Sequence, residues 1–503
     1  MNILELKRVI SKIKEFELEE YIDDASYFLS SLNDVQIRNL SNLKHCKKDY
    51  RKLLVDLDFL NSPYYLYDVN LLFRINNKEL DDIIFNCIKS DIFKNSKYHK
   101  EDLKLIITAK NRTIANYLSM LATDNNSINS AYHEEDMKII YNSNLNSSFL
   151  YKLSSNKESL NSSSHLNDMN LLKNEKLPYH LIKNMFEVAN CSDSINSTYH
   201  DYDMYIMSKS SKLSNNVIRS MAILATNKTS LLSNYHMSDM DLFLTIKRDD
   251  ILDLLIKLMT NKISLQSNWH KYDTNFLSSL DESFDNGLMT LILKCLTNID
   301  FLNSKYHEND LNELLSAKKN YYCYDALCTL MIDNNSINSK YHINDIRIIK
   351  NSDAVISKYL LDVATNIMSL NSKYHTEDMK LINDSNNPVL SQYLSLLACD
   401  KNSLENSNHL EHMRLILNSK TEEEAKYLYK ILSSNISCDK LDDIVLKITS
   451  ANLFDVNKVY LDIKCKYDSN SLDNIYNRAV LYVDGDNHKE IPSKYLKNKC
   501  FKT

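Results

Sequence analysis

Residues 370–382 read LNSKYHTEDMKLI in one-letter code, and variants of this phrase recur along most of the 503-residue chain. Its His returns at intervals of 32 to 37 residues. The ten positions are His99, His133, His165, His200, His236, His270, His307, His342, His375 and His409. One interval earlier Tyr65 takes the place of the His, so eleven copies are recognisable. Self-similarity at a fixed period of this length is the signature of stacked structural repeats.

Each copy contains two helical stretches. In the copy around His375, residues 376–382 continue the phrase as a short helix. Pro388 suits the first turn of a second helix, and residues 389–398 are longer and more apolar. Helices this short are marginal alone, so neighbouring copies must stabilise one another. We therefore expect an all-α fold, a right-handed α-solenoid of about 11 to 13 two-helix repeats.

Composition and boundaries agree with this fold class. The chain has only two glycines, whereas sheet proteins and phosphate-binding loops use glycine freely. The repeats resemble tetratricopeptide (TPR), HEAT and armadillo arrays in architecture, without the Trp, Gly and Pro pattern of tetratricopeptide units, and the resemblance carries over no functional residue. We expect N-terminal helices and a degenerate capping repeat over 1–58, the eleven repeats over 59–440, and capping helices with a basic tail over 441–503.

Charge and cysteine content narrow the classes of partner. The formal net charge is −6, which gives no global reason to expect a nucleic acid or an anionic membrane. The ten cysteines form no C-x-x-C pair, and we expect free thiols in a reducing compartment. No run is long and apolar enough for a membrane span. These features predict a cytoplasmic protein without membrane, metal or cofactor, and the weight of Asn, Lys and Ile suggests an AT-rich genome.

The His and Asp of the phrase lie three residues apart, and we interpret them as structural. With His as the N-cap, Asp at the third helical position would bond the first backbone N–H, and Tyr would pack on the Met that follows Asp. The capping residues would be His99, Asp102, His133, Asp136, His200, Asp203, His236, Asp239, His342, Asp345, His375 and Asp378. A zinc site needs more ligands than one copy offers. Catalysis needs one unique arrangement, whereas every copy carries this one, so we expect no enzyme.

Positions that differ between copies are the candidates for binding. The residue after the Met (or its equivalent) differs most, and the candidates at this position are Lys104, Lys138, Tyr205, Asp241, Arg347, Lys380 and Arg414. The residue before the Tyr adds further basic side chains at Lys97, Lys305, Lys340 and Lys373. We expect a scaffold that holds a partner protein or peptide. RNA or DNA binding along the basic positions is the alternative, and a structural spacer or self-assembling rod is a third.

Overall fold

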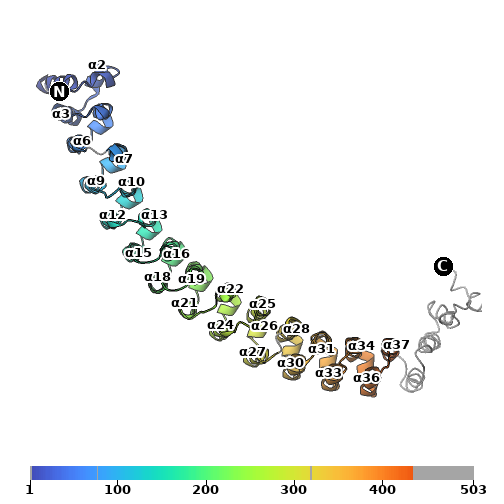
Figure 1. Ribbon diagram of the computed structural model, residues 1–503. Helices are drawn as coiled ribbons and strands as arrows, with labels where there is room; N and C mark the ends of the chain where they lie inside the picture. Colours follow the sequence, from blue (N-terminus) through green and yellow to red (C-terminus); the bar gives the residue numbers. More distant parts are fainter. Residues whose placement is uncertain (1–2, 76–77, 318–319, 434–503) are drawn as a thin grey trace, which may run out of the picture. The chain divides into compact units, whose positions relative to one another are not determined.

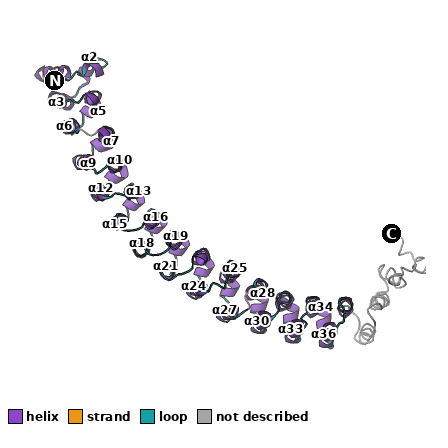
Figure 2. Ribbon diagram, viewed as in Figure 1, coloured by secondary structure: helices purple, strands orange, loops and turns teal. Residues whose placement is uncertain are grey.

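The computed structural model describes residues 3–75, 78–317 and 320–433, and the regular structure in these ranges is entirely helical (Figures 1 and 2). The helices run from α1 to α37 as a regular series, so the predicted α-solenoid is confirmed. The chain divides into two compact units, Met1–Leu252 and Asp253–Thr503, which we call the N-terminal and C-terminal halves. The predicted capping helices and tail over 441–503 lie outside the described residues.

Each repeat contains the expected pair of helices, followed by a single-turn helix. In the repeat around His133, α12 (His133–Asn142) is followed by α13 (Ser147–Ser154) and by a single turn, α14 (Lys157–Leu160). The side chain of Asn156 caps α14 by accepting hydrogen bonds from the backbone N–H groups of Glu158 and Ser159. We call the three the first, second and short helix. The short helix leads directly into the next copy of the phrase.

The N-terminal half begins with α1 (Ile3–Glu15), α2 (Ala25–Ser31), α3 (Asp34–Ser41) and α4 (Arg51–Leu54). Its first helices are α6 (Tyr65–Arg74), α9 (His99–Ile107), α12, α15 (His165–Leu172), α18 (His200–Lys209) and α21 (His236–Phe243). Its second helices are α7 (Lys78–Lys89), α10 (Arg112–Ala122), α13, α16 (Tyr179–Ala189) and α19 (Asn215–Thr226). Its short helices are α5 (Leu57–Leu60), α8 (Asp91–Lys94), α11 (Asn125–Ile128), α14, α17 (Ser192–Ile195) and α20 (Lys228–Leu231).

The C-terminal half repeats this order, and α22 (Leu252–Met259) is its earliest second helix. Its first helices are α24 (His270–Ser279), α27 (His307–Leu315), α30 (His342–Asn351), α33 (His375–Asp384) and α36 (His409–Leu417). The other second helices are α25 (Asn286–Leu296), α28 (Tyr321–Ile332), α31 (Ile356–Thr365), α34 (Pro388–Ala398) and α37 (Glu422–Leu432). The short helices are α23 (Lys262–Leu265), α26 (Ile299–Leu302), α29 (Asn334–Ile337), α32 (Ile367–Leu370) and α35 (Lys401–Leu404).

Within each half, first and second helices form two layers, and the core lies between them. Helix α10, for example, contacts α7 and α13 in its own layer and α9 and α12 in the other (Figure 1). Its apolar residues Ile114, Leu118 and Leu121 are fully buried. The helices of the second type are thus held by neighbours from adjacent repeats. This explains how helices of 8 to 12 residues are stable.

Candidate functional site

The first helices begin at the His of the phrase, one residue earlier than we expected. Helix α12 starts at His133, and Tyr132 occupies the N-cap position without a side-chain cap hydrogen bond. The Ser two residues before the Tyr shares in this turn, because Ser130 Oγ accepts from the Tyr132 backbone N–H at 3.1 Å. The His and Asp side chains do not cap their own helix. They bond to the neighbouring repeats.

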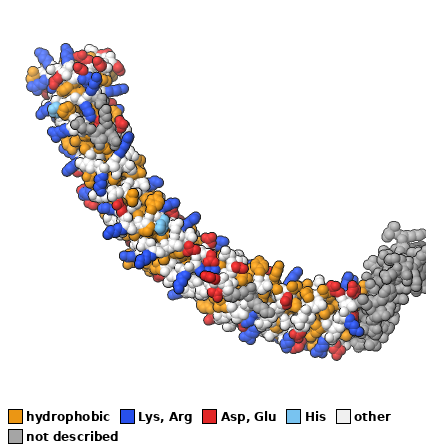
Figure 3. Space-filling model, in the orientation of Figure 1, with side chains coloured by type: hydrophobic (Ala, Val, Ile, Leu, Met, Phe, Trp, Pro, Cys, Tyr) orange, Lys and Arg blue, Asp and Glu red, His pale blue; other side chains and the backbone are white. Residues whose placement is uncertain are grey.

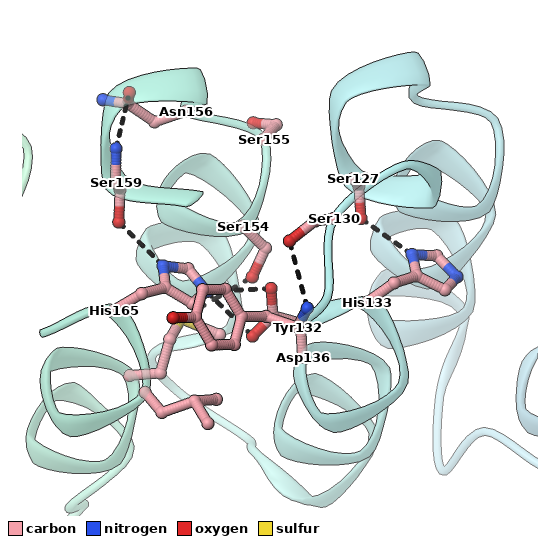
Figure 4. A network of polar contacts seen from close by, with 12 residues as sticks. Ser127, Ser130, Tyr132, His133, Asp136, Ser154, Ser155, Asn156, Ser159 and His165 are labelled. Carbon is pink, nitrogen blue, oxygen red and sulfur yellow. Dashed lines mark hydrogen bonds and ion pairs between the residues drawn. The ribbon is translucent and has the colours of Figure 1, made fainter. Parts of the chain in front are cut away.

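Each described His–Asp hydrogen bond joins two successive repeats. His133 Nε2 lies 3.0 Å from Asp102 in the preceding first helix, and His165 Nε2 lies 2.9 Å from Asp136 (Figure 4). The other pairs, at 2.7 to 3.0 Å, are Asp68–His99, Asp168–His200, Asp203–His236, Asp273–His307, Asp310–His342, Asp345–His375 and Asp378–His409. All these side chains are almost completely buried. The phrase therefore recurs because it forms the junction between repeats.

The second ring nitrogen of the His is bonded by the short helix. In Figure 4, Ser127 and Ser159 approach the Nδ1 atoms of His133 and His165, each at 2.8 Å. The same contact recurs at 2.7 to 2.9 Å in Ser194–His200, Ser230–His236, Ser264–His270, Ser336–His342, Ser369–His375 and Ser403–His409. The described contacts give Ser127 Oγ no other acceptor, so the hydroxyl donates to Nδ1. Nε2 then donates the hydrogen bond to the Asp.

Two of the pairs hold one more proton. Phe93 and Phe301 replace the Ser, and the Nδ1 atoms of His99 and His307 face the backbone carbonyls of these residues at 3.1 and 3.3 Å. A carbonyl only accepts, so Nδ1 must carry a proton. The contact of Nε2 with the carboxylate needs a second proton. Both Nε2–Asp distances are 2.7 Å, among the shortest in the series.

Aromatic rings flank both of these His rings. The His99 ring lies between Tyr64, stacked with a centroid distance of 4.2 Å, and Phe93, also at 4.2 Å. Trp269 and Phe301 flank His307 at 4.6 and 4.4 Å.

Where the phrase has a Tyr, its ring and hydroxyl can reach forward to the next repeat. The Tyr132 ring stacks on His165 at 4.9 Å, and its hydroxyl donates to the carbonyl of Ser162 at 3.2 Å. Tyr341 likewise stacks on His375 at 4.5 Å and donates to the Ser372 carbonyl at 3.2 Å. The Tyr thus adds a ring contact and a hydrogen bond to the junction that the His–Asp pair forms.

The series of pairs is complete at both ends. Tyr65 stands at the first His position, and its hydroxyl donates to the Leu54 carbonyl at 3.2 Å inside the core. His412 stands at the last Asp position and is buried. Our sequence analysis found the substitution by Tyr65 but did not place His412 in the Asp register. The first junction Asp is therefore Asp68 and the last junction His is His409.

Burial raises the pKa of junction carboxyls such as Asp68 and Asp310. Desolvation raises the pKa of Asp68 above its ordinary value, and the hydrogen bond from His99 opposes this shift. The pKa of Asp310 is raised in the same way, with His342 opposing. A buried pair of this kind adds little net stability, but loss of either partner leaves the other polar group buried and unpaired. The junctions therefore determine which residues must face one another more than they add net stability.

The junction geometry offers no metal centre within the part of the chain that the structure describes. No group of three or more His, Cys, Asp or Glu side chains is placed to hold an ion there. Among the described helices, none is both long and apolar enough to cross a membrane.

The seven predicted partner-binding residues are exposed on first helices, but ion pairs occupy several of them. Lys138 pairs with Glu134 at 2.7 Å, and Lys380 pairs with Glu377 at 2.9 Å. Arg347 reaches back to Glu313 of α27 at 3.2 Å. Asp241 accepts from Tyr202 at 2.5 Å. Lys104, Arg414 and Tyr205 are exposed, and Tyr205 lies under the Lys209 ammonium at 5.3 Å.

The short helices form a third exposed strip, which our sequence analysis did not treat as a surface of its own. Two hollows of about 450 and 470 Å³ lie along it, beside α11 and α14 and beside α14 and α17. Exposed amides line both, including Asn129, Asn161 and Asn196. These Asn side chains follow the Leu or Ile that opens the phrase, so their recurrence was the available signal.

Comparisons of the chain with models of protein families, with curated proteins and with solved structures found no match.

Proposed function

We propose that this protein is a non-enzymatic scaffold that holds a partner protein or peptide along the exposed strips of its repeats. One observation carries the proposal. The side chains that recur through most repeats and could perform chemistry lie in buried junctions, as in Asp310, His342 and Ser336. Residues at the exposed positions differ from repeat to repeat, which allows different contacts along an extended surface.

The mixed charge of the surface supports a protein partner over a nucleic acid. On the face shown in Figure 3, Lys and Arg lie among Asp and Glu, and hydrophobic side chains surface between them. Four of the predicted binding positions already form contacts with opposite charges or a phenol, at Lys138, Arg347, Lys380 and Asp241. The phrase Tyr rings stack on buried His rings, so they are not free to stack on bases.

Purification of the untagged protein from its native cells at low salt tests this proposal. We expect a low ratio of absorbance at 260 and 280 nm, with one protein partner at fixed stoichiometry. A high ratio that collapses after nuclease treatment or in high salt would contradict the proposal and favour nucleic-acid binding. Recovery of the chain alone as a regular polymer would instead favour a self-assembling rod.

A further inference from the structure

The short-helix strip of the C-terminal half carries an exposed Lys followed by a half-buried Tyr in three successive repeats. We call Lys305, Lys340 and Lys373, with the Tyr that follows each, the Lys–Tyr edge. Each ammonium lies 4.8 Å from the centroid of the following Tyr ring. This cation–π contact holds three positive charges at equivalent places. In the N-terminal half, the arrangement occurs at Lys97 alone, since Ala131, Ser163 and Thr198 follow at that position.

Within residues 3–433, as far as the structure describes them, no ion pair neutralises the positive charges of the Lys–Tyr edge. The described contacts give none of Lys305, Lys340 and Lys373 a carboxylate partner. On the first helices of the same half, Arg347 and Lys380 are paired with Glu313 and Glu377. In the Lys–Tyr edge, a Tyr ring covers one side of each lysine ammonium and partly desolvates it. A bound carboxylate could therefore pair with these cations.

Aliphatic side chains accompany these cations. Ile299 at the start of α26 and Ile367 at the start of α32 are 55% and 56% exposed, and Met368 is 40% exposed. The short helices α26, α29 and α32 contact one another in sequence, so these residues belong to the same strip as the lysines. Apolar surface next to unpaired positive charge is typical of a site for a mixed acidic and aliphatic segment.

The spacing of the edge points to the conformation of that segment. Packed helices lie about 8–10 Å apart, so equivalent lysines recur at roughly this interval. A polyproline II segment has three residues per turn with a rise of about 3.1 Å each, or about 9.3 Å per turn. Acidic residues at every third position of such a segment would all face the edge, one for each lysine.

Given the proposed binding function, we propose that the Lys–Tyr edge binds an acidic peptide segment in the polyproline II conformation, with carboxylates at every third residue and aliphatic residues between them. Each carboxylate pairs with one of Lys305, Lys340 and Lys373. The aliphatic side chains lie against Ile299, Ile367 and Met368.

Fluorescence anisotropy with the full chain tests the site. The probe is a fluorescein-labelled peptide of five Glu-Pro-Leu repeats, compared with a peptide of equal composition whose Glu residues are contiguous. We expect the repeating peptide to bind at least tenfold more tightly. The triple variant K305E/K340E/K373E should weaken its binding at least tenfold. The matched variant K104E/K380E/R414E changes the charge equally on first helices and should weaken it less than threefold.

Each other outcome overturns the inference. Equal losses in both triple variants would show unspecific attraction, and equal binding of both peptides would remove the spacing argument. Tighter binding of a twelve-nucleotide uridine RNA, lost in K305E/K340E/K373E, would assign the edge to nucleic acid. Absence of peptide binding rejects this site, whereas the scaffold proposal fails only if no protein partner co-purifies. If the charge reversals impair folding, lysine-to-glutamine variants that keep the native circular dichroism spectrum replace them in the binding measurement.

Discussion

Asp310 and His342 lie 3.0 Å apart across the junction of two successive repeats, and neither side chain has exposed surface. The same contact recurs through both halves, so the stability of each half depends on a series of equivalent junctions. Since the partners are buried, removal of one leaves a polar group in the core without its hydrogen bond.

The variant Asp310→Leu should destabilise the C-terminal half. His342 Nε2 would lose its acceptor, and we expect the free energy of unfolding to fall by about 1–3 kcal/mol. Urea denaturation with hydrogen exchange of α27 and α30 measures the loss and locates it. Asn309→Leu changes an exposed neighbour and should stay within about 0.5 kcal/mol. Equal losses in the two variants would contradict a specific junction.

Whether Nδ1 of a junction His carries a proton should depend on whether Phe or Ser lies six positions earlier. With Phe301 in that position, Nδ1 of His307 should carry a proton, whereas Nδ1 of His342, which accepts from Ser336, should not. Nitrogen-15 NMR of histidine-labelled protein distinguishes the two states, with His→Gln variants for assignment. A bare Nδ1 at His307 would disprove the proton count.

The forward hydrogen bond of the Tyr should contribute measurable stability. Tyr341→Phe removes the bond to the Ser372 carbonyl but keeps the ring on His375, and we expect a loss of about 0.5–1.5 kcal/mol. Tyr306 stacks on His342 in the same way, and the described contacts give its hydroxyl no acceptor. Tyr306→Phe is therefore the matched control and should be nearly neutral in thermal denaturation. A larger loss for Tyr306→Phe would refute this assignment.

Glu313 should make stability depend on acid pH. The hydrogen bond from Lys350 lowers the pKa of Glu313 below its ordinary value of 4.5, and Arg347 adds to this shift. A lowered native pKa contributes stability above pH 4.5 that is lost as the pH falls through the native value. Glu313→Gln should therefore reduce the stability lost between pH 5 and pH 3, measured by urea midpoints. Lys350→Met should reduce it too, and unchanged pH profiles would reject the assignment.

The repeat period could be predicted because the phrase returns at a nearly fixed interval along the sequence. The helical class could be predicted because the apolar spacing of each helix lies within one repeat. The junction did not follow, since His133 and Asp102 are 31 residues apart and meet only when successive first helices are placed side by side. The sequence did contain correlated signals. Tyr65 and His412 replace the two junction residues at opposite ends of the series, and Phe93 or Phe301 replaces the recurring Ser. A single copy of the phrase, considered alone, predicts that the Asp caps its own helix.

The junction has a direction, because each repeat presents a His to the repeat before it and an Asp to the repeat after it. Repeats are therefore interchangeable modules. Removal of residues 342–374 would place His375 directly after Tyr341, with Ser336 still six positions before it and Asp310 one module before it. Slippage or unequal crossing-over of the gene in whole modules would thus leave every junction complete. A chain built this way can change its length without a change in the residues of its core.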